Sequence, residues 1–221
     1  MLYKSIILAL AAATTVAGHG AIVKAVGDMG GSGQALGVVD GTPRTGTKKD
    51  PNQLDSTRFK NEAADQCGET LGGGTNNPAA QVPAMIAANP GAMPQISAGG
   101  MVMMTLHQVN GDGAGPYTCM MDATGTGNGP WTMMQVATNV PGTNSRSKAK
   151  ATDFPLTAMV PADQTCTGSM GGQDGMCMVK CMNDANAGPF GGCVPVQMGG
   201  TNATNPPPPQ KRSLKSKVLR A

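Results

Sequence analysis

The chain has 221 residues, a formal net charge of +3 at pH 7, six cysteines and only six aromatic residues. This length supports a single domain with a substantial core. The positive charge belongs to the C-terminal end: residues 19–200 carry 13 acidic and 10 basic residues, whereas the last 21 residues carry five basic residues and no acidic one. Because no basic face is interleaved with aromatic residues, the composition argues against a nucleic-acid partner.

Residues 1–18 have the organisation of a secretory signal peptide. A short basic segment is followed by an apolar run over residues 5–16 and then by small residues that suit signal peptidase. The run is too short to span a bilayer and no second run follows, so we expect no membrane segment. Cleavage after Gly18 would make His19 the first residue of a secreted, extracellular protein. Cleavage after Ala13, the alternative, would leave His19 internal.

An even number of cysteines in an exported chain predicts disulfides, although the sequence leaves most of the pairing open. Cys166 and Cys177 are close enough along the chain to staple one loop. Cys177 and Cys181 have a spacing that also occurs in zinc sites, which is the alternative interpretation. The cysteines are Cys67, Cys119, Cys166, Cys177, Cys181 and Cys193.

Short apolar and β-branched runs, separated by glycine- and proline-rich turns, predict an all-β fold. The two strongest strands are expected at residues 21–26 and 101–107. Shorter strands are expected at residues 117–122, 131–138, 154–160, 176–182 and 194–198. This spacing favours an immunoglobulin-like antiparallel β-sandwich with long Gly/Pro-rich loops and disulfides. Short helices near residues 56–65 and 79–88 would interrupt the long segment between the two strongest strands.

We expect residues 19–200 to form one domain and residues 201–221 to form a disordered, proline-rich basic tail. The tail holds four consecutive prolines, a glycosylation sequon at Asn202 and a dibasic pair at Lys211-Arg212. That pair is either a cleavage site for a secretory-pathway protease or an ordinary solvated charge cluster.

His19 and His107 are the only histidines of the chain. An N-terminal His19 offers an amine and an imidazole that can chelate one metal ion, and His107 would supply a third nitrogen. A nitrogen-rich tetragonal set suits copper(II), so we predict a site for one copper ion. The alternative is that His107 is an ordinary structural histidine on a strand.

Other side chains qualify the copper prediction. Phe190 lies in a turn of small residues and would cap the axial direction of the site without binding the metal, a role for which Tyr117 is the rival candidate. Methionine is abundant, with 17 residues, and thioethers bind Cu(I). Side-chain alternation puts Met101 and Met103 on the same strand face as His107. Since methionine also fills irregular cores, we expect packing roles and assign no methionine as a ligand.

Three segments resemble the fungal Egh-type virulence factors, a family that includes appressorium-specific secreted proteins. They are HQVNGDGAGPYTC at residues 107–119, NVPGTN at residues 139–144 and AGPFGGCVPVQ at residues 187–197. The resemblance implies a secreted fungal protein that is associated with host penetration.

A second, looser resemblance is to lytic polysaccharide monooxygenases, through the mature His-Gly start, the strand histidine and the late aromatic residue. It implies that His19 and His107 hold copper beside an axial Phe190, and that the protein oxidises cell-wall polysaccharide. Gly188 stands where many such enzymes have a glutamine. The alternative function is a non-catalytic secreted effector or wall-binding protein that acts at the host surface. In either case we expect a monomer.

Overall fold

A computed structural model describes residues 19–89 and 93–199. The predicted signal peptide and the predicted basic tail lie outside these residues. Within them, none of the helices is long and apolar enough to cross a membrane.

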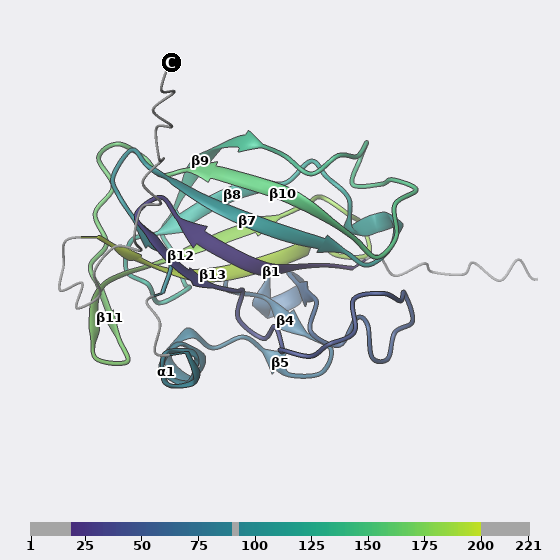
Figure 1. The fold of residues 1–221 in the computed structure, drawn as a ribbon, viewed down its shortest axis with the longest axis horizontal. Coiled ribbons are helices and arrows are strands. Elements are labelled where there is room, and N and C mark those ends of the chain that lie inside the picture. The colour runs from purple at the N-terminus through teal and green to yellow at the C-terminus, as the bar shows by residue number, and fades with distance from the viewer. Residues whose placement is uncertain (1–18, 90–92, 200–221) are drawn as a thin grey trace, which may run out of the picture.

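Seven strands form one closed, hydrogen-bonded circuit in the order β12-β8-β9-β10-β7-β1-β13, with β13 pairing back to β12 (Figure 1). Their bounds are β1 Gly20–Gly27, β7 Met101–Gln108, β8 Thr118–Asp122, β9 Trp131–Thr138, β10 Thr152–Met159, β12 Gln173–Met182 and β13 Phe190–Met198. Neighbouring strands run antiparallel except β1 and β13, which are parallel. The N-terminal strand therefore closes the barrel beside the last strand.

Short elements decorate this barrel. The additional strands are β2 Gly30–Gly33, β3 Thr57–Arg58, β4 Glu69–Thr70, β5 Gly74–Thr75, β6 Gln95–Ile96 and β11 Gly168–Met170. The helices are α1 Pro78–Ala88 and the 3-10 turns η1 Asn61–Ala63 and η2 Gly111–Gly113. Helix α1 and strands β4 and β5 lie together on one side of the barrel, below it in Figure 1.

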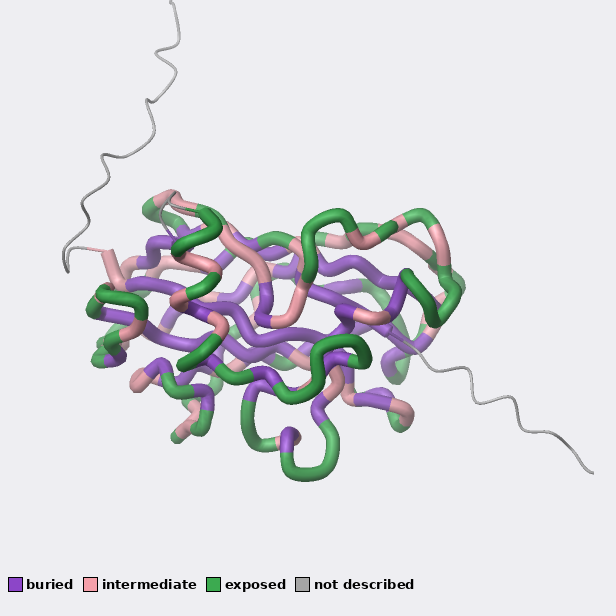
Figure 2. Tube along the Cα trace, turned by 90° about the horizontal axis from the view of Figure 1, so that it is seen from below, coloured by how far each residue is buried: buried purple, intermediate pink, exposed green. Residues whose placement is uncertain are grey.

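Apolar side chains pack in two places. The larger cluster fills the barrel and includes Ile22, Leu106 and Val194. The smaller cluster lies between the outer face of the barrel and the layer that contains α1, where Val82 and Leu36 are fully buried with Met178. Figure 2 shows the buried strands at the centre and the exposed segments in the loops around them.

The prediction of an all-β fold with disulfides is confirmed. The immunoglobulin-like sandwich is not clear in the structure, because the seven strands form one continuous circuit rather than two separate sheets. The expected helix at residues 79–88 is present as α1, and Asn77 caps it by accepting a hydrogen bond from the Ala80 amide. The expected helix at residues 56–65 is wrong: this segment forms β3 and then η1, because β3 pairs with β4 and with β13.

All six cysteines form disulfides, and none of the described cysteines is free. The predicted pair Cys166–Cys177 is confirmed. The other two bonds are Cys67–Cys193 and Cys119–Cys181. Since Cys177 and Cys181 both carry disulfides, they are not ligands of a zinc ion. Three disulfides fit a protein of an oxidising, extracellular environment.

Candidate metal centre

His19 lies at the entrance of β1, and backbone contacts fix its position. The Val109 amide donates to the His19 carbonyl over 2.9 Å, so the pairing of β1 with β7 extends as far as His19. The His19 main-chain nitrogen donates to Oδ1 of Asn110 over 2.6 Å. The loop that follows β7 packs directly on this residue, because a Cβ atom at Gly113 would stand only 2.2 Å from the His19 carbonyl oxygen. The main-chain nitrogen of His19 is thus held at a defined place.

His107 lies on β7 directly opposite Ala21 of β1. Because side chains alternate along a strand, His19 and Ala21 occupy the face of the sheet on which His107 also lies. The two histidines are therefore diagonal neighbours on adjacent strands, although 87 residues separate them in the sequence. Both are buried in the full chain, with relative exposures of 4% for His19 and 1% for His107.

Asp153 orients the His107 ring. It is the register partner of His107 on β10, and its Oδ1 lies 2.7 Å from Nδ1 of His107. A carboxylate accepts hydrogen bonds, so this contact places the ring proton on Nδ1 and leaves the lone pair on Nε2. The Nε2 atom is buried and has no hydrogen-bond partner. A carboxylate behind one ring nitrogen with the other nitrogen free is the usual arrangement of a metal-binding histidine.

Phe190 begins β13 and contacts the His19 ring. The two ring centroids are 4.8 Å apart and the ring planes are tilted by 38°. The parallel pairing of β1 with β13, in which Ala21 faces Gly191, produces this proximity. Tyr117 has a different role: its hydroxyl donates to the Gly113 carbonyl over 2.9 Å, and burial raises the pKa of its phenol far above the usual value. Of the two axial candidates, Phe190 makes the ring contact.

A small pocket lies beside His19. It contains about 220 Å³ of space not filled by protein atoms, part of it open to solvent. It is lined by His19, Ser56, Arg58, Glu69, Thr70 and Leu71. Arg58 donates through Nη2 to Glu69, whereas Arg58 Nε and Ser56 Oγ are buried without a hydrogen-bond partner. Sequence reasoning missed this polar pocket because it expected a helix in this segment.

The donor atoms at this place are nitrogens rather than carboxylate oxygens or thiolate sulfurs, and nitrogen donors fit a copper ion. Among residues 19–89 and 93–199, no group of three or more His, Cys, Asp or Glu side chains could hold a metal ion. A metal at the histidine pair would therefore use the two imidazoles and the His19 amine. Asp153 and Asn110, the residues that orient these nitrogens, had no signal in the sequence, since their partners are set by strand register.

A family model for Egh16-like virulence factors matches residues 17–191. This chain belongs to the Egh16-like virulence factor family. It is 52% identical to the appressoria-specific virulence factor GAS1 of Pyricularia oryzae, over the whole of this chain and 87% of that protein. It is 38% identical to the appressoria-specific virulence factor GAS2 of the same fungus, over 56% of this chain and 46% of that protein.

The match to the Egh-type family confirms the first resemblance noted in the sequence. No solved structure matches this chain. The resemblance to lytic polysaccharide monooxygenases, and with it the copper site, stays a prediction.

Proposed function

We propose that this family member is a secreted, infection-related protein whose mature N-terminus binds one copper ion through the His19 amine, the His19 imidazole and Nε2 of His107. The observation that carries the proposal is the state of His107. Its Nδ1 is occupied by Asp153, and its Nε2 is buried with no partner. A buried nitrogen lone pair without a hydrogen bond costs free energy, and a metal ion would satisfy it.

Each neighbouring residue has a defined task in this proposal. Asp153 fixes the tautomer and the orientation of His107. Phe190 covers the His19 ring and would shield a bound metal ion on that side. Asn110 holds the N-terminal nitrogen. Bound copper would supply redox chemistry, and the substrate would be a cell-wall polysaccharide of host or fungus that is oxidised at a C–H bond.

Cleavage after Gly18 is a condition of this function, because the main-chain nitrogen of His19 is an amine ligand only when no residue precedes it. The leader lies outside the described residues, so direct sequencing must establish the cleavage point. The secreted protein should begin at His19 and take up one Cu(II) ion, with an electron paramagnetic resonance spectrum that shows nitrogen ligands. His107→Ala should abolish stoichiometric binding. A different N-terminus, or unchanged binding in His107→Ala, would contradict the proposal.

The catalytic part needs a separate experiment. The copper-loaded protein, given a reductant and hydrogen peroxide, should release oxidised oligosaccharides from chitin, pectin or cellulose. The His107→Ala variant, purified and treated in the same way, serves as the matched control. Absence of oxidised products across such a panel, with copper bound, would leave a copper-binding protein that is not an oxidase.

A second candidate is a non-catalytic effector or wall-binding protein. One observation favours it: none of the aromatic side chains in the described part of the chain is exposed. Phe59, Tyr117 and Phe190 are buried, while Trp131 and Phe154 are partly buried. A flat aromatic surface for polysaccharide is thus missing from residues 19–89 and 93–199. Retained binding to wall material or host proteins in His107→Ala would support this candidate.

A further inference from the structure

Methionines of this chain fall into two groups. The expected packing role holds for five of the thirteen in the strands: Met104, Met121, Met134, Met176 and Met178 are at most 5% exposed. A second group lies on the outer face of the barrel, outside the cluster that packs against the α1 layer.

Three methionines of this second group lie together. Met101 of β7 and Met159 of β10 are register partners, directly across from one another. Met103 follows Met101 on the same face of β7, because Val102 between them points into the barrel and is fully buried. Directly opposed residues have Cβ atoms about 5 Å apart and diagonal neighbours about 7–8 Å apart. Three long, flexible thioether side chains at such spacing can reach one common point.

Solvent reaches this cluster. Met103 is 40% exposed, and Met101 and Met159 are partly buried. The direct register partners of the cluster are uncharged: Val26 and Thr157 flank Met103, and Gln135 of β9 pairs with Met159.

One carboxylate lies near the cluster, that of Asp28. It accepts hydrogen bonds from the Ser97 amide and hydroxyl and from the Met101 amide. It is therefore committed to holding the backbone at the start of β7. Lys24, the register partner of Thr105 on β1, is exposed and is a diagonal neighbour of Met103 on this face. The side chains of the cluster itself offer sulfur.

We propose that Met101, Met103 and Met159 form a thioether site for one soft monovalent ion, Cu(I). Thioether sulfur selects Cu(I) over the hard and borderline divalent ions, so this site would discriminate against Ca²⁺, Mg²⁺ and Zn²⁺. It is distinct from the proposed histidine site. Met103 is four residues from His107 on the same face of β7, which corresponds to about 13 Å. The thioether site does not use His19 or His107, so it can fail or succeed independently of the proposed copper site.

Silver(I), a redox-inert stand-in for Cu(I), provides a direct test in the mature protein with ¹³C-labelled methionine methyl groups. Titration should shift three methyl resonances together, saturating at one ion per chain. The triple variant Met101→Leu/Met103→Leu/Met159→Leu should lose this saturable binding. Leucine and methionine have similar volumes, so the fold should survive. The single variant Met103→Leu, at the exposed position, should weaken binding by about tenfold or more and serves if the triple variant does not fold.

The chain offers a control in Met120 and Met133, which are also register partners on the outer face. Met182 is a diagonal neighbour of Met120, but the direct partner of Met120 on β12 is the cationic Lys180, which disfavours a bound cation there. Met120→Leu/Met133→Leu should leave the silver binding unchanged, and so should His107→Ala. Titrations in which the protein competes with a chelator for Cu(I) should rank the variants by affinity in the same order as the silver titrations. Weak shifts of many methionine methyls without saturation, or binding that persists in the triple variant, would overturn the proposal.

Discussion

Asp153 shows how much a single residue contributes to the site. Its carboxylate is 62% exposed, yet it contacts a histidine ring that is almost completely buried. The exposed partner thus controls which nitrogen of the buried ring carries the proton. The residue has no role in the core, so its removal tests orientation without the confounding effect of a cavity.

We predict that Asp153→Ala lowers the affinity for Cu(II) by about 10–100-fold, because His107 loses the group that fixes its tautomer and ring position. Asp153→Asn, which can still accept the hydrogen bond, should cause a smaller loss. Competition titration against a chelator of known affinity measures both effects. Asp163→Ala, an exposed carboxylate in the turn after β10, is the control and should bind as the wild type does. Equal affinity in all variants would show that Asp153 does not position His107.

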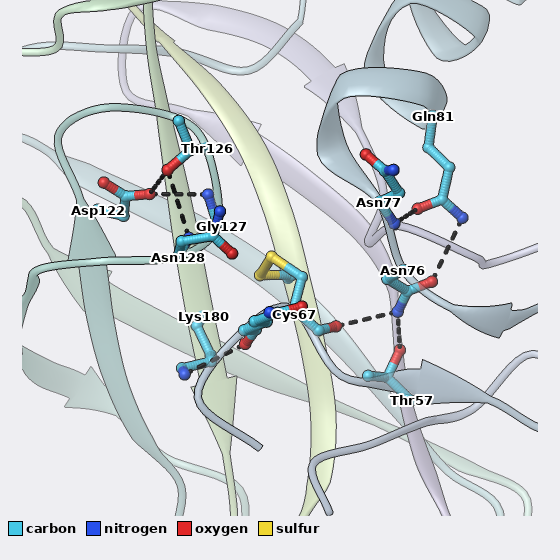
Figure 3. Close-up of a disulfide and its surroundings, with 12 residues drawn as sticks. Thr57, Cys67, Asn76, Asn77, Gln81, Asp122, Thr126, Gly127, Asn128 and Lys180 are labelled. Atoms are coloured by element: carbon cyan, nitrogen blue, oxygen red, sulfur yellow. Dashed lines mark hydrogen bonds between the residues drawn. A yellow bond between two sulfur atoms is a disulfide. The ribbon is translucent and has the colours of Figure 1, made fainter. Parts of the chain in front are cut away.

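Lys180 shows how one strand holds an adjacent loop. It is buried near the end of β12, and its Nζ donates to the carbonyls of Ala64, Asp65 and Gln66 at 3.2–3.4 Å. Figure 3 shows Lys180 beside the segment that carries Cys67. The ammonium group also lies 4.1 Å from the centre of the Trp131 ring. These contacts fasten the segment that leads from η1 to Cys67. Burial lowers the pKa of Lys180 to about 8, an effect that nearby Asp65 opposes.

This pKa predicts a pH dependence of stability. The unfolded chain, with a lysine pKa of about 10.5, keeps the proton between pH 8 and 10.5, whereas the folded chain releases it. Since the unfolded state binds more protons, the free energy of unfolding should rise with pH across this window through Lys180. Below pH 8 both states are protonated and this dependence vanishes. Urea unfolding of wild type and Lys180→Met from pH 7 to 10 isolates the contribution, with exposed Lys24→Met as control. If the free energy of unfolding changes with pH in the same way for wild type and Lys180→Met, this prediction is wrong.

The disulfides also act on elements of the fold, and they should differ in effect. Cys67–Cys193 joins the loop layer to β13 across 126 residues, whereas Cys166–Cys177 closes a separation of only 11. Chain entropy predicts a loss of about 5 kcal/mol for Cys67→Ala/Cys193→Ala and about 3 kcal/mol for Cys166→Ala/Cys177→Ala. Denaturant unfolding measures the difference. The first variant should also exchange amide protons of residues 57–67 faster, and an unchanged exchange pattern would contradict the proposed anchoring.

At the scale of the whole molecule, the candidate site depends on the closure of the barrel. β1 follows directly after His19, β7 carries His107, β10 carries Asp153 and β13 carries Phe190. These four strands are consecutive in the circuit, although the chain visits them far apart in sequence. The parallel β1–β13 pair is the contact that sets Phe190 against His19.

Cu(II) binding at the proposed site should therefore depend on which residue begins the chain and on the pH. A form that retains Gly18 has an amide where the mature protein has an amine, so it should lose stoichiometric Cu(II) binding while its unfolding midpoint stays unchanged. In the mature form, Cu(II) affinity should fall as the pH drops from 8 to 5, because protons compete with the metal for the α-amine, whose reference pKa is about 7.7–8. Isothermal titration calorimetry measures both. If the form that retains Gly18 binds Cu(II) equally well, the His19 amine is not a ligand.

The positions of the barrel strands could be predicted because each strand carries its own signal. The alternation of Val102, Met104 and Leu106 with more exposed residues places β7, and the expected segment at residues 131–138 coincides with β9. The helix expected at residues 56–65 failed because β3 gains its structure from pairing with two distant strands. Propensity over a short window cannot register such partners.

By itself, the sequence determined the all-β class, the cysteine-rich character and the two histidines that a metal site would have to use. These follow from local alternation and composition, which any segment displays without the rest of the chain. Only the tertiary structure decided that the strands form a closed circuit, that Asp153 lies behind His107 and that Phe190 rather than Tyr117 contacts His19. Those facts depend on strand order and register, which are fixed by the packing of the whole barrel and leave no mark in any single segment.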